Sequence, residues 1–250
     1  MPWGEIETLD RGDGVHLAYE SSHGRGPAVV WLSGFKSDMA GTKAQVLADW
    51  ARAKGQSFLR LDYSGHGRSG GAFEDGTIGR WRDDALAVID SASAGPLVLV
   101  GSSMGGWLAL LVAKARPERV LSMVLIAPAA DFPQALLWEG LDPAARREIE
   151  ETGRWARPSA YDPQPYVITR RLIEEGRDHL LLGAPIAFSG PVRILQGARD
   201  PDVPFAHAQL LADRLTTDDL AFTLIRDGDH RLSRPQDLKK LIAAVEELCG

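Results

Sequence analysis

The sequence predicts an α/β protein with a mostly parallel sheet and helices on both of its faces. Short apolar segments rich in Val, Ile and Leu alternate along the chain with longer amphipathic segments, which is the pattern of strands joined by helices. The strand-like segments from residue 28 onward are almost continuously apolar, as strands covered on both faces must be. Right-handed crossovers between such strands give a parallel sheet.

Eight segments predict strands, and the first two alternate polar and apolar residues as an antiparallel edge with one wet face does. Their ranges are about 4–10, 15–21, 28–33, 57–62, 97–102, 121–127, 192–197 and 221–226. Helices are predicted between them at about 40–54, 77–93, 104–115, 204–215 and 235–248. Asp75 and Thr77 are candidate N-caps of the second helix, and Pro235 suits the first turn of the last.

The alternation of strand-like and helical segments is interrupted between residues 131 and 185. This stretch shows no strand-like segment but several helical ones, such as 142–153 and 164–176. Trp138, Trp155, Tyr161 and Tyr166 are scattered through it. An insertion of this size between two strands predicts a small helical lid over one edge of the sheet. Because no linker or repeat divides the chain, we expect a single domain over residues 1–250 with the lid at about 131–185.

Composition excludes several classes of protein. The formal net charge is −6 and no block of Lys or Arg stands out, so nucleic acid is not expected as a partner. Residues 91–113 carry no charge, but Pro96 and the Gly/Ser cluster at 101–106 divide them, so no integral membrane segment is expected. No His, Cys, Asp or Glu cluster has metal-ligand spacing. We therefore expect no metal and no cofactor.

Two features of the sequence indicate a cytoplasmic protein. Cys249 is the single cysteine, which precludes an internal disulfide and suits a reducing compartment. The first ten residues, MPWGEIETLD, have neither a basic region nor an apolar core of the kind that export signals carry. The composition does not indicate an oligomeric state.

The segment Gly101-Ser102-Ser103-Met104-Gly105 has the form G-x-S-x-G, with an apolar strand before it and a helical pattern after it. This is the context of a nucleophile elbow, in which a strained turn exposes the central serine. Glycines two residues before and after the tip remove Cβ atoms that would collide there. Ser103 is therefore the predicted nucleophile. Ser102 fits less well, because its corresponding neighbours are Val100 and Met104.

A serine nucleophile needs a general base, and the base needs an acid to orient it. His230 follows the last predicted strand and comes last in the order Ser, Asp, His that this arrangement requires; His66, in a tight turn flanked by glycines, is the alternative. Asp200 is the first acid after the strand at 192–197 and is preferred over Asp202, while Asp131 is a further alternative.

The oxyanion that forms during acyl transfer needs two donors, usually backbone N–H groups. Met104 directly follows the nucleophile, and the loop after the strand at 28–33 supplies the second donor, for which we choose the N–H of Phe35. The dense motif LDYSGHGRSGG at 61–71 lacks the lysine and spacing of a phosphate-binding loop. We interpret it as scaffold near the mouth of the pocket.

With these elements in place, the chain resembles an α/β-hydrolase. The segments RLDYSGHGRS (60–69), LVGSSMGGWL (99–108), RDPDVP (199–204) and DHR (229–231) resemble the family of alpha/beta-hydrolase domain-containing protein 10. That resemblance implies a palmitoyl-protein thioesterase that also cleaves acyl-glucuronides. It also implies Ser103, Asp200 and His230 as the triad, on an eight-stranded sheet.

These observations predict a serine hydrolase that cleaves esters or thioesters with an apolar acyl group, carried by a small molecule or by an acylated protein. The thioester and the apolar acyl group rest on the resemblance. A small-molecule carboxylesterase or a C–C bond hydrolase is the alternative, and a non-catalytic ligand-binding member of the fold is a distant one.

Overall fold

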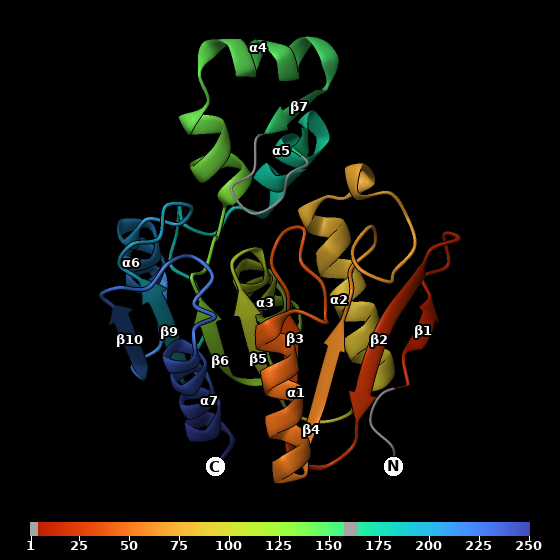
Figure 1. Ribbon diagram of the computed structural model, residues 1–250, viewed down its shortest axis with the longest axis vertical. Helices are drawn as coiled ribbons and strands as arrows, with labels where there is room; N and C mark the ends of the chain where they lie inside the picture. The colour runs from red at the N-terminus through yellow and green to blue at the C-terminus, as the bar shows by residue number, and fades with distance from the viewer. Residues whose placement is uncertain (1–4, 158–164) are drawn as a thin grey trace.

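The computed structural model describes residues 5–157 and 165–250, which are built around one large β-sheet (Figure 1). Its eight strands are β1 (Glu7–Asp10), β2 (His16–Ser22), β3 (Arg25–Leu32), β4 (Gln56–Leu61), β5 (Leu97–Ser102), β6 (Val120–Ile126), β9 (Val192–Gly197) and β10 (Leu220–Ile225). They lie in the order β1-β2-β4-β3-β5-β6-β9-β10. β2 is antiparallel to β1 and to β4, and all other neighbours are parallel. The predicted α/β class and mostly parallel sheet are confirmed.

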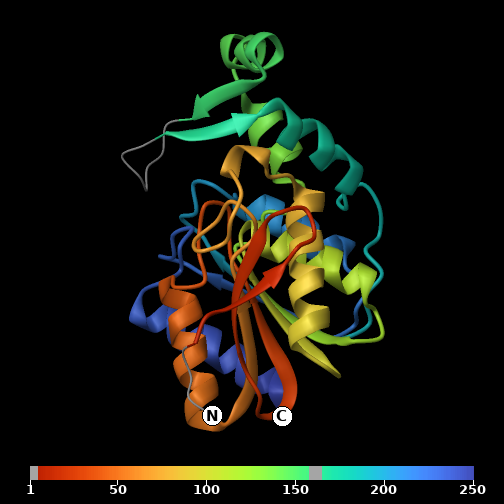
Figure 2. The ribbon, with the colours of Figure 1, turned by 90° about the vertical axis from the view of Figure 1, so that its right-hand side faces the viewer.

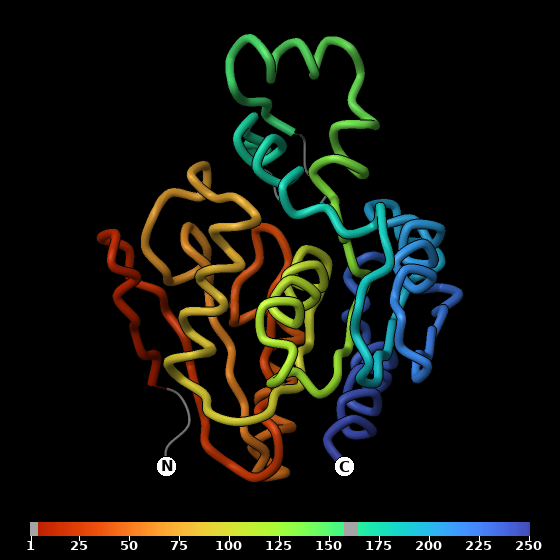
Figure 3. Tube along the Cα trace, turned by 180° about the vertical axis from the view of Figure 1, so that it is seen from behind, coloured from red at the N-terminus to blue at the C-terminus, as the bar shows by residue number. Residues whose placement is uncertain are grey.

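Helices cover both faces of this sheet, as Figures 2 and 3 show from two further directions. One face carries α1 (Thr42–Lys54) and α7 (Pro235–Cys249), and the other carries α2 (Ile78–Ala92), α3 (Met104–Ala115) and α6 (Phe205–Arg214). Successive strand residues point to opposite faces. In β5, for example, Val98 and Val100 join the core beneath α1 and α7, and Leu97 and Leu99 join the other.

The helix ends follow from local side-chain chemistry. Thr77 caps α2 by accepting a hydrogen bond from the N–H of Arg80 at 3.2 Å, as predicted for one of the two candidate caps. Gly55 ends α1 in the left-handed conformation with φ +63°, which glycine adopts without steric cost. Pro235 occupies the first turn of α7, where its missing N–H costs no hydrogen bond.

The strand order creates a crevice at the carboxyl ends of β3 and β5. From β3 the chain passes through α1 to β4 on one side, whereas from β5 it passes through α3 to β6 on the other. Adjacent strands whose connections diverge in this way leave an opening between their loops, and ligands bind there in open α/β sheets. The loop after β3 and the turn after β5 both lie at this opening.

The stretch predicted as a lid leaves the sheet after β6 and returns at β9. It contains α4 (Pro143–Thr152), β7 (Arg154–Arg157), β8 (Tyr166–Thr169) and α5 (Arg170–Gly176), which lie beyond the carboxyl ends of the strands in Figures 1 and 2. Among the helices of the described ranges, none has both the length and the apolar character needed to cross a membrane.

The prediction that this stretch holds no strand is wrong, because β7 and β8 form a two-stranded antiparallel sheet. The segment 164–176 was expected to be helical throughout, but Tyr166–Thr169 is extended and only Arg170–Gly176 is helical. Thr169 caps that helix through its side chain, so the strand ends where the helix begins. Tyr161 lies outside the described residues.

Candidate active site

Ser103 lies at the tip of a strained turn between β5 and α3. Its backbone has φ +56° and ψ −120°, a conformation that costs free energy for any residue other than glycine. Backbone hydrogen bonds hold the turn, since the N–H of Ser103 donates to the carbonyl of Ile126 at 2.8 Å. Ser102 remains in β5, buried and paired with Ile126.

The two flanking glycines are required by close backbone approach. A Cβ on Gly101 would lie 2.2 Å from the carbonyl oxygen of Gly105, and one on Gly105 would lie 2.0 Å from that of Leu32. Both distances are far below contact, and the obstacle is backbone that cannot rotate away. The absence of side chains here allows α3 to begin directly against β3.

The structure brings the three residues proposed for a triad into one hydrogen-bonded chain. The Nε2 of His230 lies 3.1 Å from the Oγ of Ser103, and its Nδ1 lies 2.8 Å from the Oδ2 of Asp200. A carboxylate only accepts hydrogen bonds, so Nδ1 carries the ring proton and Nε2 is left to accept the proton of the serine hydroxyl. This is the protonation state that a general base needs before reaction.

Asp200 is fixed by donors on both of its oxygens. Oδ1 accepts the N–H groups of Asp202 and Val203 at 2.9 and 2.8 Å, and Oδ2 accepts the Nε2 of Gln196 at 3.2 Å in addition to His230. The side chain of Asp200 is fully buried. A buried carboxylate with this many donors keeps its orientation.

The loops after β9 and β10 approach each other closely, which brings Asp200 and His230 together. A Cβ on Gly197, the last residue of β9, would lie 2.5 Å from the carbonyl oxygens of Gly228 and Asp229. Glycine at this position therefore lets the loop that carries His230 cross over the end of β9.

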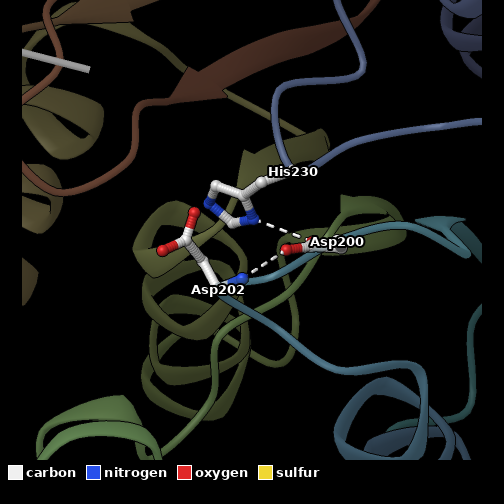
Figure 4. Close-up of side chains that lie close together, drawn as sticks. All are labelled: Asp200, Asp202 and His230. Carbon is white, nitrogen blue, oxygen red and sulfur yellow. Dashed lines mark hydrogen bonds and ion pairs between the residues drawn. The ribbon is translucent and has the colours of Figure 1, made fainter. Parts of the chain in front are cut away.

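The other two candidate acids are engaged elsewhere. Figure 4 shows Asp202 in the same loop as Asp200, with the Nδ1 of His230 directed at Asp200, and the carboxylate of Asp202 forms an ion pair with Arg157 at 3.7 Å. Asp131, with φ +59°, accepts the N–H groups of Leu181 and Leu182. It thereby joins the two ends of the insertion. Burial raises the pKa of the Asp131 carboxyl.

Asp200, Asp202 and His230 are also the one group in the described ranges whose donor atoms lie close enough together, within 4.8 Å, to hold a metal ion. Both oxygens of Asp200 already accept two hydrogen bonds each, and both ring nitrogens of His230 have partners. A metal ion would have to displace these bonds. The donors therefore fit a hydrogen-bonded triad better than a metal site.

The candidate oxyanion donors lie on either side of Ser103. Met104 is the first residue of α3, and N–H groups of a first helical turn have no partner within the helix. The loop after β3 passes directly beside the nucleophile, because a Cβ on Gly34 would lie 3.3 Å from the Cβ of Ser103. Phe35, the next residue, lines the same cavity. Phe35 and Met104 thus both border the cavity beside Ser103, where the predicted oxyanion donors are needed.

Ser103 opens into a cavity of about 510 Å³ between the sheet and the insertion. Most of the apolar residues on its wall come from the loop after β3, from the start of α3 and from the chain between β6 and α4: Phe35, Met104, Ala129, Phe132, Leu136 and Leu137. Arg157 and Tyr166 belong to β7 and β8. Neither was predicted as a cavity residue, because Arg157 lies between the two segments expected to be helical and Tyr166 lies within one of them.

His66, the alternative base, is buried against the back of the loop after β3. Its Nε2 accepts the N–H of Lys36 at 3.2 Å, and its Nδ1 lies 3.2 Å from the carbonyl oxygen of Ser64. Burial lowers the pKa of His66 to about 4. Both ring nitrogens are thus directed at backbone groups, and the motif at 61–71 supports the loop that passes Ser103.

The chain is similar to known proteins over most of its length. The family model described as serine aminopeptidase, S33 matches residues 26–171. Palmitoyl-protein thioesterase ABHD10, mitochondrial, from Mus musculus is 38% identical over 97% of this chain and 82% of its own length. The solved structure of alpha/beta hydrolase domain-containing protein 10 from mouse has a TM-score of 0.91 at 37% identity, covering 98% of both chains. The solved structure of a putative hydrolase from Agrobacterium vitis S4 has a TM-score of 0.95 at 43% identity, covering 100% of both chains.

The elbow, the crevice at β3 and β5 and the order of Ser103, Asp200 and His230 along the chain have the arrangement of a hydrolase built on this sheet. With the similarity extending over nearly the whole chain, the protein is a serine hydrolase of the α/β-hydrolase fold and belongs to the family of palmitoyl-protein thioesterase ABHD10.

Proposed function

We propose that this enzyme hydrolyses esters and thioesters with an apolar acyl group through an acyl-enzyme on Ser103. The Oγ of Ser103 attacks the carbonyl carbon while the Nε2 of His230 takes its proton, and Asp200 stabilises the imidazolium that results. The N–H groups of Phe35 and Met104 stabilise the oxyanion. His230 then protonates the leaving thiol or alcohol, and water releases the acid by the same steps.

One observation carries this proposal, namely the unbroken hydrogen-bond chain from Ser103 through His230 to a fully buried Asp200. A protein that only binds a ligand has no need of a serine in this strained geometry beside a correctly oriented imidazole. The strain at Ser103 is offset by the surrounding turn, as at other sites where a functional residue is held exposed.

The cavity supports an apolar acyl group. Phe132, Leu136 and Leu137 form an apolar wall close to Ser103, and burial of acyl methylenes against such a wall contributes about 0.8 kcal/mol each. The relative from mouse is named a palmitoyl-protein thioesterase, and we extend a thioester substrate to this chain. Small acyl thioesters and acylated proteins both present that group.

A fluorophosphonate probe tests the nucleophile. Such a probe forms a covalent bond only with an activated serine, so the wild-type protein should be labelled and Ser103→Ala should not. Ser102→Ala is the matched control, because it removes the neighbouring hydroxyl and leaves the proposed triad intact. Equal labelling of wild type and Ser103→Ala would contradict the assignment.

A panel of acyl substrates tests the substrate class. Thioesters and oxyesters of matched acyl chains, from two to sixteen carbons, should show kcat/KM rising with chain length until the apolar wall is filled. Ser103→Ala provides the blank. Turnover restricted to short oxyesters would contradict the thioesterase proposal and favour a small-molecule carboxylesterase.

We also propose that the enzyme works in the cytoplasm. The one cysteine, Cys249, is half-buried and unpaired, which is in keeping with a reducing compartment. The relatives from mouse and human are named as mitochondrial. Fractionation of the source cells followed by activity-based labelling would identify the compartment, and labelling confined to an organelle fraction would refute this part of the proposal.

A further inference from the structure

The loop that passes Ser103 contains a tight turn with an unusual backbone conformation. The N–H of Ser37 donates to the carbonyl of Gly34 at 3.1 Å, and Lys36, the third residue of the turn, has φ +58°. A turn with positive φ at this position usually has glycine or asparagine there. Because lysine is disfavoured in this conformation, the turn needs support from outside.

His66 provides this support. Its Nε2 accepts the N–H of Lys36 at 3.2 Å, and its Nδ1 lies 3.2 Å from the carbonyl of Ser64. A carbonyl only accepts, so Nδ1 carries the proton and Nε2 is the free acceptor. The bond to Lys36 therefore exists only when the ring is neutral.

The surroundings of His66 keep the ring neutral. Burial lowers its pKa to about 4, with the charge of Lys36 acting in the same direction and those of Asp84 and Asp38 opposing it. At neutral pH the ring is therefore an acceptor with a fixed tautomer.

An aromatic cluster fixes the position of the ring as well as its charge. The rings of Tyr63, Phe73 and Trp81 pack on it in edge-to-face arrangements, with centroid distances of 5.6, 5.1 and 5.1 Å. The ring of Phe35 packs on the same Phe73 and Trp81, at 4.9 and 5.8 Å. His66 and the Phe35 side chain thus share one rigid support, although they come from loops after different strands.

We propose that His66 is a positioning residue of the oxyanion hole, which acts by holding the turn at Lys36 so that the N–H of Phe35 stays directed at the substrate carbonyl. This inference rests on the proposed function. Donors to an oxyanion must lie 2.7–3.1 Å from the place where the charge develops. A turn that relaxes at Lys36 moves the preceding peptide, and the donor is then misplaced by an amount that matters for catalysis.

Asp62, in the same motif, supports the far end of this loop. Its Oδ1 accepts the N–H of Met39 at 2.7 Å, while Oδ2 accepts the N–H of Arg68 at 2.8 Å. The motif at 61–71 therefore holds the loop at two points. Of these two contacts, the one from His66 to Lys36 is next to Phe35 in the chain, so we assign the positioning of the Phe35 N–H to His66.

The test compares His66→Leu, which removes the acceptor, with His66→Gln, whose amide oxygen can take the place of Nε2. His66→Leu should lower kcat by about 10- to 100-fold with KM changed less than about threefold, because the lost interaction acts in the transition state. His66→Gln should recover to within about fivefold of wild type. Phe73→Leu is the packing comparison, since it loosens the same cluster and keeps the acceptor, and its loss of kcat should be smaller than that of His66→Leu.

A trifluoromethyl ketone with the same acyl chain supplies a measurement that a merely structural role would not change. Ser103 adds to its carbonyl and gives a tetrahedral oxyanion, so its inhibition constant should rise in His66→Leu by the same factor as kcat/KM falls. If His66→Leu does not fold, His66→Asn, whose shorter amide does not reach Lys36, replaces it with the same expected losses.

The outcomes separate this inference from the proposed function. Wild-type protein that neither hydrolyses the acyl panel nor reacts with the fluorophosphonate would refute the proposed function. Active wild type with an equally active His66→Leu would overturn only the inference. The inference would also be overturned if His66→Gln were as impaired as His66→Leu, or if the ketone bound both variants as tightly as wild type.

Discussion

Gly105→Ala tests whether the elbow depends on direct contact between α3 and β3. The added Cβ would lie 2.0 Å from the carbonyl oxygen of Leu32, about 1.4 Å short of an ordinary contact at 3.4 Å. Neither partner is a side chain that could rotate, so α3 must shift by about 1 Å. Overpacking of this kind costs about 1–3 kcal/mol or more, and the better helix propensity of alanine returns at most about 1 kcal/mol. With a clash this severe the cost lies at the upper end of that range, so we expect a net loss of about 2 kcal/mol in unfolding free energy.

The shift of α3 should also lower the activity, because α3 begins at Met104, directly after Ser103. A displacement of about 1 Å at the nucleophile should lower kcat/KM by about 100-fold. Urea unfolding followed by tryptophan fluorescence measures the stability, and hydrolysis of a short acyl ester under folding conditions measures the activity. Gly140→Ala is the matched control: no atom lies within 4 Å of its added Cβ, so its stability should stay within about 1 kcal/mol of wild type. A Gly105→Ala protein with unchanged stability and full activity would refute the reasoning.

Three further predictions follow from the hydrogen bonds of the structure. Asp200→Asn should lower kcat by about 10³- to 10⁴-fold, because the amide favours the wrong tautomer of His230. Asp202→Asn should lower kcat by less than about tenfold in the same steady-state assay. A larger loss of kcat in Asp202→Asn than in Asp200→Asn would reverse the choice of acid. Thr77→Ala removes the cap of α2 and should lower the unfolding free energy by about 1 kcal/mol in urea; no change would show that the cap is dispensable. The pKa of His66 falls from 6.5 in the unfolded chain to about 4 in the folded protein, so between these pH values His66 is protonated only in the unfolded chain. The stability that the neutral, buried ring contributes is therefore present above pH 6.5 and is lost toward pH 4. The unfolding free energy should fall by about 2 kcal/mol between pH 7 and pH 5. Urea unfolding at the two pH values should show this loss in wild type but not in His66→Gln, and equal losses in both would contradict it.

The sheet and the strained turn at Ser103 could be predicted because each depends on local sequence. Strands buried on both faces must be apolar along their length, so β3, β5, β6 and β9 are visible as runs. The elbow is visible because the backbone contacts at Gly101 and Gly105 exclude every side chain. Both are constraints on residue type that any single sequence displays.

The hairpin of β7 and β8 could not be predicted for the opposite reason. Arg154–Arg157 is only partly buried and has no polar–apolar alternation, since Trp155 and Ala156 lie together between two arginines, while Tyr166–Thr169 runs directly into α5. Two short strands satisfy each other's backbone groups whatever side chains they carry. Their pairing therefore depends on the fold around them, and with it the presence of Arg157 and Tyr166 at the cavity.

His66 and His230, the two candidates for the general base, show why a residue type alone does not determine a role. His66 and His230 both lie in loops that follow strands, β4 and β10. Their environments differ: the ring of His66 is closed in by aromatic rings and bonded to backbone groups, while that of His230 lies between a hydroxyl and a carboxylate. A histidine with a pKa of about 4 is a weak base but a dependable hydrogen-bond acceptor at neutral pH. The same side chain can thus be the proton carrier at one position and a support for the oxyanion loop at the other, and the surrounding charges and contacts decide which.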